Sequence, residues 1–170
     1  GLSHASCVNL AGDGTCNDLY GHGTFVGGLI DGTGAASAGQ YAGVAPGSKI
    51  VSVKIAGASG AADVSNVIAG IQWVTAFHSA YNIKVLNLSL GSNGTQSYML
   101  SPLDYAVEQA WKAGVTVVVA ASNLGPGAGT IDKPADDPFV ITVGATDDNG
   151  TAGLSDDSVP VFSAQGPTAA

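Results

Sequence analysis

Short runs of apolar residues, many of them Val or Ile, recur along this chain after residue 40. Runs of this length and composition predict buried β-strands. They are Lys49–Ile55, Lys84–Leu90, Val115–Ala121 and Phe139–Ala145. The third run is β-branched almost throughout, as expected of a parallel strand that helices cover on both faces.

Between these runs, apolar residues recur at helical spacing. One helix is predicted to begin at Asp63, with a face formed by Val64, Val67, Ile68, Ile71, Val74 and His78. A second is predicted from about Met99 to Lys112, stopped by Gly114, with an apolar side of Leu103, Ala106, Val107, Ala110 and Trp111. This alternation predicts right-handed βαβ crossovers, and therefore an α/β fold with a parallel sheet, in a single domain 1–170.

Ligands of such sheets bind beyond the carboxyl ends of the strands. Two polar segments leave those ends here, Ser89-Leu90-Gly91-Ser92 and Ser122-Asn123-Leu124-Gly125. We therefore expect the functional site to include both segments.

A further candidate for chemistry is the segment Gly21-His22-Gly23-Thr24. It precedes the apolar run Phe25–Ile30, which predicts an imidazole at the start of a buried helix. Such a ring can act as a general base, and it then requires a nucleophile and usually an orienting carboxylate.

Composition excludes several function classes. The net charge is −8 and all five cationic residues are lysines, so nucleic-acid binding is not expected. No apolar stretch is long enough to span a membrane. No charged and apolar leader follows Gly1, so we expect that any signal or pro-segment was removed or left out. Few cations, many small polar residues and only two cysteines favour a secreted protein.

Cys7 and Cys16 lie close together in a glycine-rich segment. We favour a short-loop disulfide, which would stabilise the fold by roughly 2–3 kcal/mol. The alternatives are two free thiols, or a zinc pair completed by His4, for which the usual short ligand spacing is missing.

Seven ordered motifs between about residues 20 and 167 resemble those of the subtilisin-like serine peptidases. The motifs are GHGTFVGG at 21–28, GVAPGSKIVSVKI at 43–55, VLNLSLG at 85–91, VTVVVAASN at 115–123, Pro134-Ala135, VITVGATD at 140–147 and FSAQGP at 162–167. The order of the motifs makes the match specific, although any one alone is weak. The resemblance implies a three-layer α/β/α fold around a mainly parallel sheet.

The resemblance also assigns roles to individual residues. His22 would be the general base of a serine endopeptidase, and the Asn123 amide would stabilise the oxyanion. Ser89-Leu90-Gly91 would bind the substrate backbone as an added strand, and Ala121 and Ser122 would line the same cleft.

This chain departs from the family pattern at two positions. Ser122 replaces a frequent glycine, which is expected to narrow a substrate pocket. Phe25 replaces a frequent second histidine and is expected to pack inside the protein.

Two parts of the family's catalytic apparatus have no matching motif. No Gly-Thr-Ser-Met-Ala type motif provides a nucleophile, and Ser163 belongs to an earlier landmark. Asp13 and Asp18 precede His22, but each is expected in a polar loop with no strand before it. We therefore expect an internal fragment of a catalytic domain, incomplete at both ends and inactive alone. The missing segments, or another copy of the chain, would be its partners besides a polypeptide substrate.

Three acidic pairs suggest calcium binding, namely Asp136-Asp137, Asp147-Asp148 and Asp156-Asp157. Their spacing matches no defined calcium loop, so we interpret them as a solvated acidic surface and predict no metal ligands. No cofactor is required, and structural calcium remains the alternative.

Two other functions compete with an endopeptidase. A non-catalytic peptide-binding module on the same scaffold would tolerate the absent nucleophile, but the retained histidine and asparagine argue against it. A nucleotide-binding domain is disfavoured, because Gly32-Thr33-Gly34 lacks a third glycine and Gly47-Ser48-Lys49 lacks phosphate-loop spacing.

Overall fold

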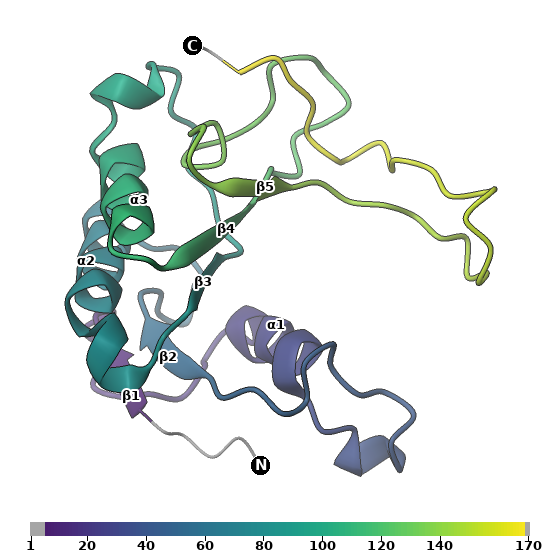
Figure 1. Cartoon of the computed structure of the whole chain (residues 1–170), viewed down its shortest axis with the longest axis horizontal. Coiled ribbons are helices and arrows are strands. Elements are labelled where there is room, and N and C mark those ends of the chain that lie inside the picture. The colour runs from purple at the N-terminus through teal and green to yellow at the C-terminus, as the bar shows by residue number, and fades with distance from the viewer. Residues whose placement is uncertain (1–5, 169–170) are drawn as a thin grey trace. The chain divides into compact units, whose positions relative to one another are not determined.

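The computed structural model describes residues 6–168 and consists of two compact units, Gly1–Trp73 and Val74–Ala170 (Figure 1). We call them the first and the second unit. Helix α2, Val64–Tyr81, crosses from one to the other. It begins one residue after the predicted Asp63, and its buried residues Val67, Ile71 and Val74 belong to the predicted apolar face.

The first unit contains two parallel strands, β1 (Ser6–Asn9) and β2 (Val51–Lys54). A disulfide joins Cys7 of β1 to Cys16, with the Cα atoms 6.2 Å apart, and this is the pairing favoured from the sequence. The Lys54 ammonium donates to Asp13 Oδ2 at 2.5 Å, to the Thr15 carbonyl at 3.1 Å and to the Asn17 carbonyl at 2.7 Å. One lysine therefore organises the loop after β1. Because β1 lies before this loop, a strand precedes Asp13 and Asp18, contrary to the expectation from the sequence.

Helix α1, His22–Asp31, begins at the histidine, and a short 3₁₀ helix follows at Ala35–Ser37. The prediction of a buried helix was wrong, because α1 has no buried residue. The Phe25 side chain, expected to pack inside, is 65% exposed. The physical reason is that the apolar run specifies a helix, whereas the burial of that helix requires another element packed against it.

The second unit contains a three-stranded parallel sheet in the order β3-β4-β5. Its strands are Val85–Leu88, Thr116–Ala120 and Ile141–Val143. They lie within three of the predicted runs, and β2 lies within the fourth. The predicted α/β class with parallel strands is therefore confirmed.

Helix α3, Pro102–Lys112, packs against β4 (Figure 1). It is shorter than the predicted helix from Met99, because a separate 3₁₀ turn at Tyr98–Leu100 precedes it. Ser101 caps α3 by accepting a hydrogen bond from the Asp104 amide at 3.3 Å, and Pro102 occupies the first turn. Proline is favoured there because its missing N–H would have no helical partner.

The core of the second unit lies between α3 and β4. Val107, Val117 and Val119 are all 0% exposed, and each such side chain stabilises the fold by about 1.5–3 kcal/mol. The other side of β4 is not covered as predicted, since Thr116 and Val118 are only partly buried and Ala120 is exposed. That second face borders the candidate site.

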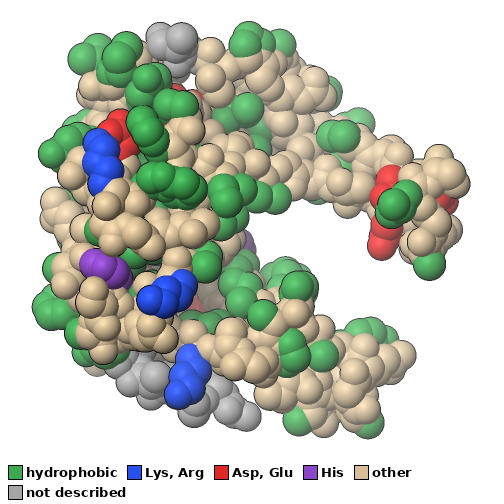
Figure 2. All heavy atoms as spheres, in the orientation of Figure 1, with side chains coloured by type: hydrophobic (Ala, Val, Ile, Leu, Met, Phe, Trp, Pro, Cys, Tyr) green, Lys and Arg blue, Asp and Glu red, His purple; other side chains and the backbone are tan. Residues whose placement is uncertain are grey.

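Many large apolar side chains remain on the surface, where Figure 2 shows them as scattered green patches. The most exposed are Tyr41, Val44, Leu100, Leu154 and Val161. Within residues 6–168, no helix is long and apolar enough to cross a membrane.

Candidate active site

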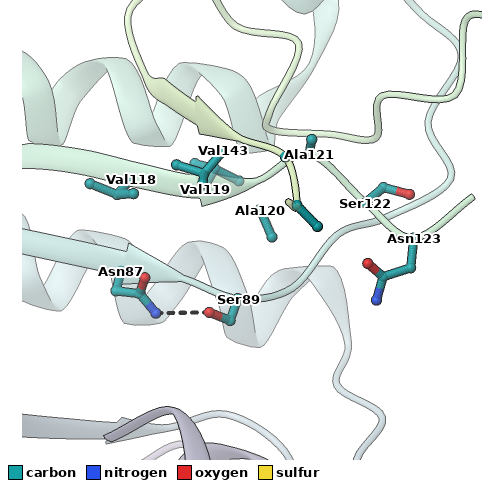
Figure 3. A pocket seen from close by; sticks show the side chains of 11 residues that line it. Asn87, Ser89, Val118, Val119, Ala120, Ala121, Ser122, Asn123 and Val143 are labelled. Atoms are coloured by element: carbon teal, nitrogen blue, oxygen red, sulfur yellow. Dashed lines mark hydrogen bonds between the residues drawn. The ribbon is translucent and has the colours of Figure 1, made fainter. Parts of the chain in front are cut away.

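A hollow of about 250 Å³ lies where strands β3 and β4 end (Figure 3). Its lining combines polar side chains with small apolar ones. The lining residues are Asn87, Ser89, Val118, Val119, Ala120, Ala121, Ser122, Asn123, Val143, Gly144 and Ala145. Four residues predicted for the site, Ser89, Ala121, Ser122 and Asn123, are therefore brought together. The hollow lies entirely within the second unit, whereas His22 belongs to the first.

Asn123 follows β4 after two residues and borders this hollow. The backbone before it is held in place, since the buried Ala121 donates its N–H to the Val143 carbonyl at 2.8 Å. Within the described part of the chain, the Asn123 side chain makes no hydrogen bond and is exposed to solvent. Its amide is therefore available to donate to a ligand.

Ser122, immediately before Asn123, adopts a φ of 109°. Residues other than glycine rarely adopt this backbone conformation, so Ser122 stores strain of about 1–3 kcal/mol. Its hydroxyl accepts a hydrogen bond from the Leu124 amide at 3.2 Å, which compensates in part. The positive φ explains why glycine would be the simpler residue at this position.

Replacing Ser122 by glycine is expected to raise the free energy of unfolding by about 1 kcal/mol. The gain from relieved strain exceeds the loss of the hydroxyl hydrogen bond and the greater freedom of glycine in the unfolded chain. Chemical denaturation of both proteins measures the difference. A Ser122→Val variant serves as the control and should be less stable than the parent, since a β-branched residue tolerates this φ still less well.

Ser89 to Gly91 continue from β3. The Asn87 amide donates to Ser89 Oγ at 2.9 Å, so the Ser89 hydroxyl is oriented along the border of the hollow (Figure 3). Leu90 and Gly91 lie beyond the lining residues. A Cβ added at Gly91 would come within 3.1 Å of the Asp132 Cβ, so only glycine fits there without a shift of its neighbour.

His22 is the first residue of α1 and its side chain is exposed. No hydrogen bond from its ring is found among residues 6–168. Asp18 instead satisfies the start of the helix. Its Oδ2 accepts from the Thr24 amide and hydroxyl, both at 2.8 Å, and its Oδ1 accepts from the Gly21 amide at 2.7 Å.

These donors hold the pKa of Asp18 well below its usual range, above all the backbone amides of Gly21 and Thr24. Asp18 therefore stabilises the first turn of α1, the helix that begins at His22. This role was not predicted from the sequence, although an acidic residue shortly before a predicted helix is a known start signal.

An Asp18→Ala variant is expected to unfold more easily by about 1 kcal/mol, the usual cost of losing a side-chain cap. An aspartate whose pKa is lowered on folding stabilises the folded state at pH values above its ordinary pKa of about 4. This stabilisation is lost as the pH falls below that value. The difference between parent and variant should therefore shrink below about pH 4. Thermal unfolding at several pH values checks both statements, and a pH-independent difference would contradict the assignment.

One acidic pair does not form the solvated surface that we expected from the sequence. Asp136 and Asp137 are only 9% and 3% exposed, and Asp104 of α3 is 0% exposed. The ammonium of Lys133 is buried among them, 2.6 Å from Asp136 Oδ2 and 3.3 Å from Asp104 Oδ2. The expectation was wrong because a lysine three residues earlier compensates part of this charge inside the protein.

Two observations within residues 6–168 concern possible metal ligands and the role of Ser163. This part of the chain contains no group of three acidic, histidine or cysteine side chains arranged to hold a metal ion. Ser163 is 2% exposed, and its hydroxyl accepts a hydrogen bond from the Ala145 amide at 3.1 Å. It is therefore a structural residue beneath the site.

Comparison with known proteins finds similar chains whose names describe proteases. It is 40% identical over 156 residues to the "Serine protease AprX" of Bacillus subtilis (strain 168), covering 89% of this chain and 35% of that protein. It is 38% identical over 140 residues to "Subtilisin Savinase" of Lederbergia lenta, covering 82% of this chain and 48% of that protein. The chain thus spans between a third and a half of these two relatives.

Solved structures show the same likeness. The "S41 Psychrophilic Protease" superposes with a TM-score of 0.77 at 28% identity, over 94% of this chain and 57% of that one. "Sphericase" gives a TM-score of 0.77 at 30% identity, over 92% and 50% of the two chains. The family model described as "Subtilase family" matches residues 8–170. The chain therefore belongs to the subtilase family.

Proposed function

We propose that this chain is part of a serine endopeptidase, in which His22 is the general base and Asn123 the oxyanion donor. The observation that carries the proposal is the Asn123 amide at the carboxyl end of β4, which is exposed and has no hydrogen-bond partner within residues 6–168. An asparagine that only ended a strand would be expected to hydrogen-bond its own backbone. The names of its relatives, among them a serine protease and a subtilisin, support the same reaction class.

The proposed reaction proceeds through an acyl-enzyme. His22 takes the proton from a serine hydroxyl while the oxygen attacks the scissile carbonyl, and it later gives that proton to the leaving amine. The Asn123 amide donates to the oxyanion formed in between, where a fixed donor is most effective. Water then hydrolyses the ester by the same steps.

The nucleophile and the orienting aspartate come, in this proposal, from segments outside these 170 residues or from another chain. Ser163 does not fit the nucleophile, because it is buried and hydrogen-bonded. Asp18 does not fit the orienting acid, because its oxygens already accept from the backbone and from Thr24. The 170-residue chain alone is therefore expected to be inactive.

The substrate would be an extended polypeptide beside Ser89-Leu90-Gly91. Strand β3 is an edge strand of the three-stranded sheet, and its continuation can accept an added strand. We place the protein outside the cell, since the Cys7–Cys16 disulfide persists in an oxidising environment.

A serine-directed fluorophosphonate probe tests the proposal. We expect it to label the longer gene product that carries upstream and downstream segments, and labelling should fall strongly in its His22→Ala variant. The 170-residue chain should remain unlabelled. A longer product that binds peptides but is never labelled would favour the non-catalytic binding module, and labelling of the 170-residue chain would contradict the missing nucleophile.

A further inference from the structure

The buried cluster around Lys133 has an imbalance of charge. It contains the three carboxyl groups of Asp104, Asp136 and Asp137 and a single ammonium group. Within residues 6–168, both oxygens of Asp104, Oδ1 of Asp136 and Oδ2 of Asp137 are buried without a hydrogen-bond partner, although Asp104 Oδ2 lies 3.3 Å from the Lys133 ammonium. One cation cannot compensate three buried carboxylates that lack these hydrogen bonds, so the cluster favours the uptake of a proton.

The neighbouring charges do not restore the balance. Glu108 and Lys112, one and two turns further along α3, neutralise each other through a contact of 2.6 Å. Strands β4 and β5 have no titratable residue. The excess negative charge therefore stays with the three aspartates.

The same cluster holds a loop against both segments of the candidate site. Lys133 and Ser92 form an antiparallel bridge, in which the Ser92 amide donates to the Lys133 carbonyl at 3.0 Å and the Lys133 amide donates back at 3.2 Å. The Asp132 amide donates to the Ala121 carbonyl at 3.2 Å. The loop 132–137 thus contacts Ser92, which follows Gly91, and Ala121, which lies two residues before Asn123.

The Lys133 side chain also supports the site-facing loop directly. A Cβ added at Gly94 would come within 2.7 Å of the Lys133 Cδ, so the aliphatic part of the lysine packs closely against this glycine. Displacement of the ammonium would therefore be transmitted to residues 92–94.

We propose that Lys133, Asp104 and Asp136 form a proton-linked anchor, which holds the loop 132–137 firmly against the two site segments when the cluster carries one extra proton and loosely when it does not. Lys133, in this view, is a positioning residue. The inference rests on the proposed function only in taking these segments as the peptide-binding ones.

The direction of the pH effect follows from the carboxyl groups. Burial raises the pKa of Asp104 to about 6, and the charge of Asp136 adds to this. Burial also raises the pKa of Asp137. A raised pKa means that the folded cluster binds more protons than the unfolded chain, so its stabilisation is present at low pH and is lost as the pH rises from about 4 to about 6.

Amide hydrogen exchange on the 170-residue chain tests the anchor without any activity measurement. We expect the protection factors of the Ser92 and Lys133 amides to fall about tenfold between pH 5 and pH 7. One bound proton changes an equilibrium tenfold per pH unit, and the effect ends at about pH 6, so only one unit of this interval contributes. In an Asp104→Asn variant, which keeps the shape but cannot titrate, this dependence should disappear. Asp148→Asn, an exposed aspartate of the same unit, is the matched control and should behave like the parent.

Protection that is independent of pH in the parent, or an Asp104→Asn variant that keeps the dependence, would overturn the anchor. The carboxyl resonance of Asp104, followed by NMR, provides a second measurement if the variant folds poorly, and a pKa below 4 would also overturn it. In a third outcome, the protection factors depend on pH, but the NMR resonances of the site residues do not shift when an extended peptide is added. This result would support the anchor and count against the proposed function.

Discussion

Replacing Lys133 by methionine is expected to lower the free energy of unfolding by about 3–5 kcal/mol, the usual effect of removing one partner from a buried ion pair. The lysine is 2% exposed, and its loss removes the cation that pairs with both Asp104 and Asp136 in residues 6–168. Methionine keeps most of the aliphatic volume that packs against Gly94, so the loss reports mainly on charge. Urea denaturation followed by circular dichroism measures it.

The control for this variant is Lys84→Met, which removes an exposed lysine of the same unit that forms no ion pair within residues 6–168. Surface substitutions of this kind change stability little, so its denaturation midpoint should hardly change. The effect of Lys133→Met should also be smaller at pH 5 than at pH 8, because protonated carboxyl groups no longer need the ammonium. Equal effects of the two substitutions would show that the buried cluster is not held by charge.

Replacing Asn123 by alanine in the complete peptidase is expected to lower kcat by about 10²–10³, a magnitude borrowed from the oxyanion asparagine of a subtilisin. The amide would stabilise charge that exists only in the transition state, so KM should change little. Hydrolysis of a chromogenic peptide by both proteins provides the two constants.

Stability separates a catalytic role of Asn123 from a structural one. Its side chain is exposed and makes no hydrogen bond within residues 6–168, so Asn123→Ala should unfold at the same urea concentration as the parent. Asn87→Ala is the matched control, since Asn87 lines the same hollow but donates to Ser89. A kcat loss in Asn87→Ala as large as that in Asn123→Ala would contradict the specific role of Asn123.

The elements of the fold were largely predictable from local pattern. All four apolar runs contain a strand, and the helix predicted from Asp63 begins at Val64. Strand β1 was not predicted, because its four residues, SCVN, do not form an apolar run. The start of the second predicted helix was also displaced, since Ser101 and Pro102 provide a stronger start signal than the apolar residues before them.

Burial was the property that local pattern predicted least well. The apolar run after His22 specifies a helix, but no residue of that helix is buried. Two adjacent aspartates at 136 and 137 indicate a surface when they are considered alone, yet both are buried beside Lys133. Charge in one segment can be compensated by another that folding brings close, and a linear pattern does not contain that information.

The sequence by itself determined four of the five strands described, the helices, the family and the residues proposed for catalysis, because each depends on neighbours along the chain or on an ordered set of motifs. Only the tertiary structure decided which of these residues share a hollow. It assigned Asp18 to the start of α1 and Ser163 to a buried hydrogen bond, and it placed a lysine among three carboxyl groups. These roles depend on distances between segments that lie far apart in the chain. Tertiary packing sets such distances, and local propensity does not determine them.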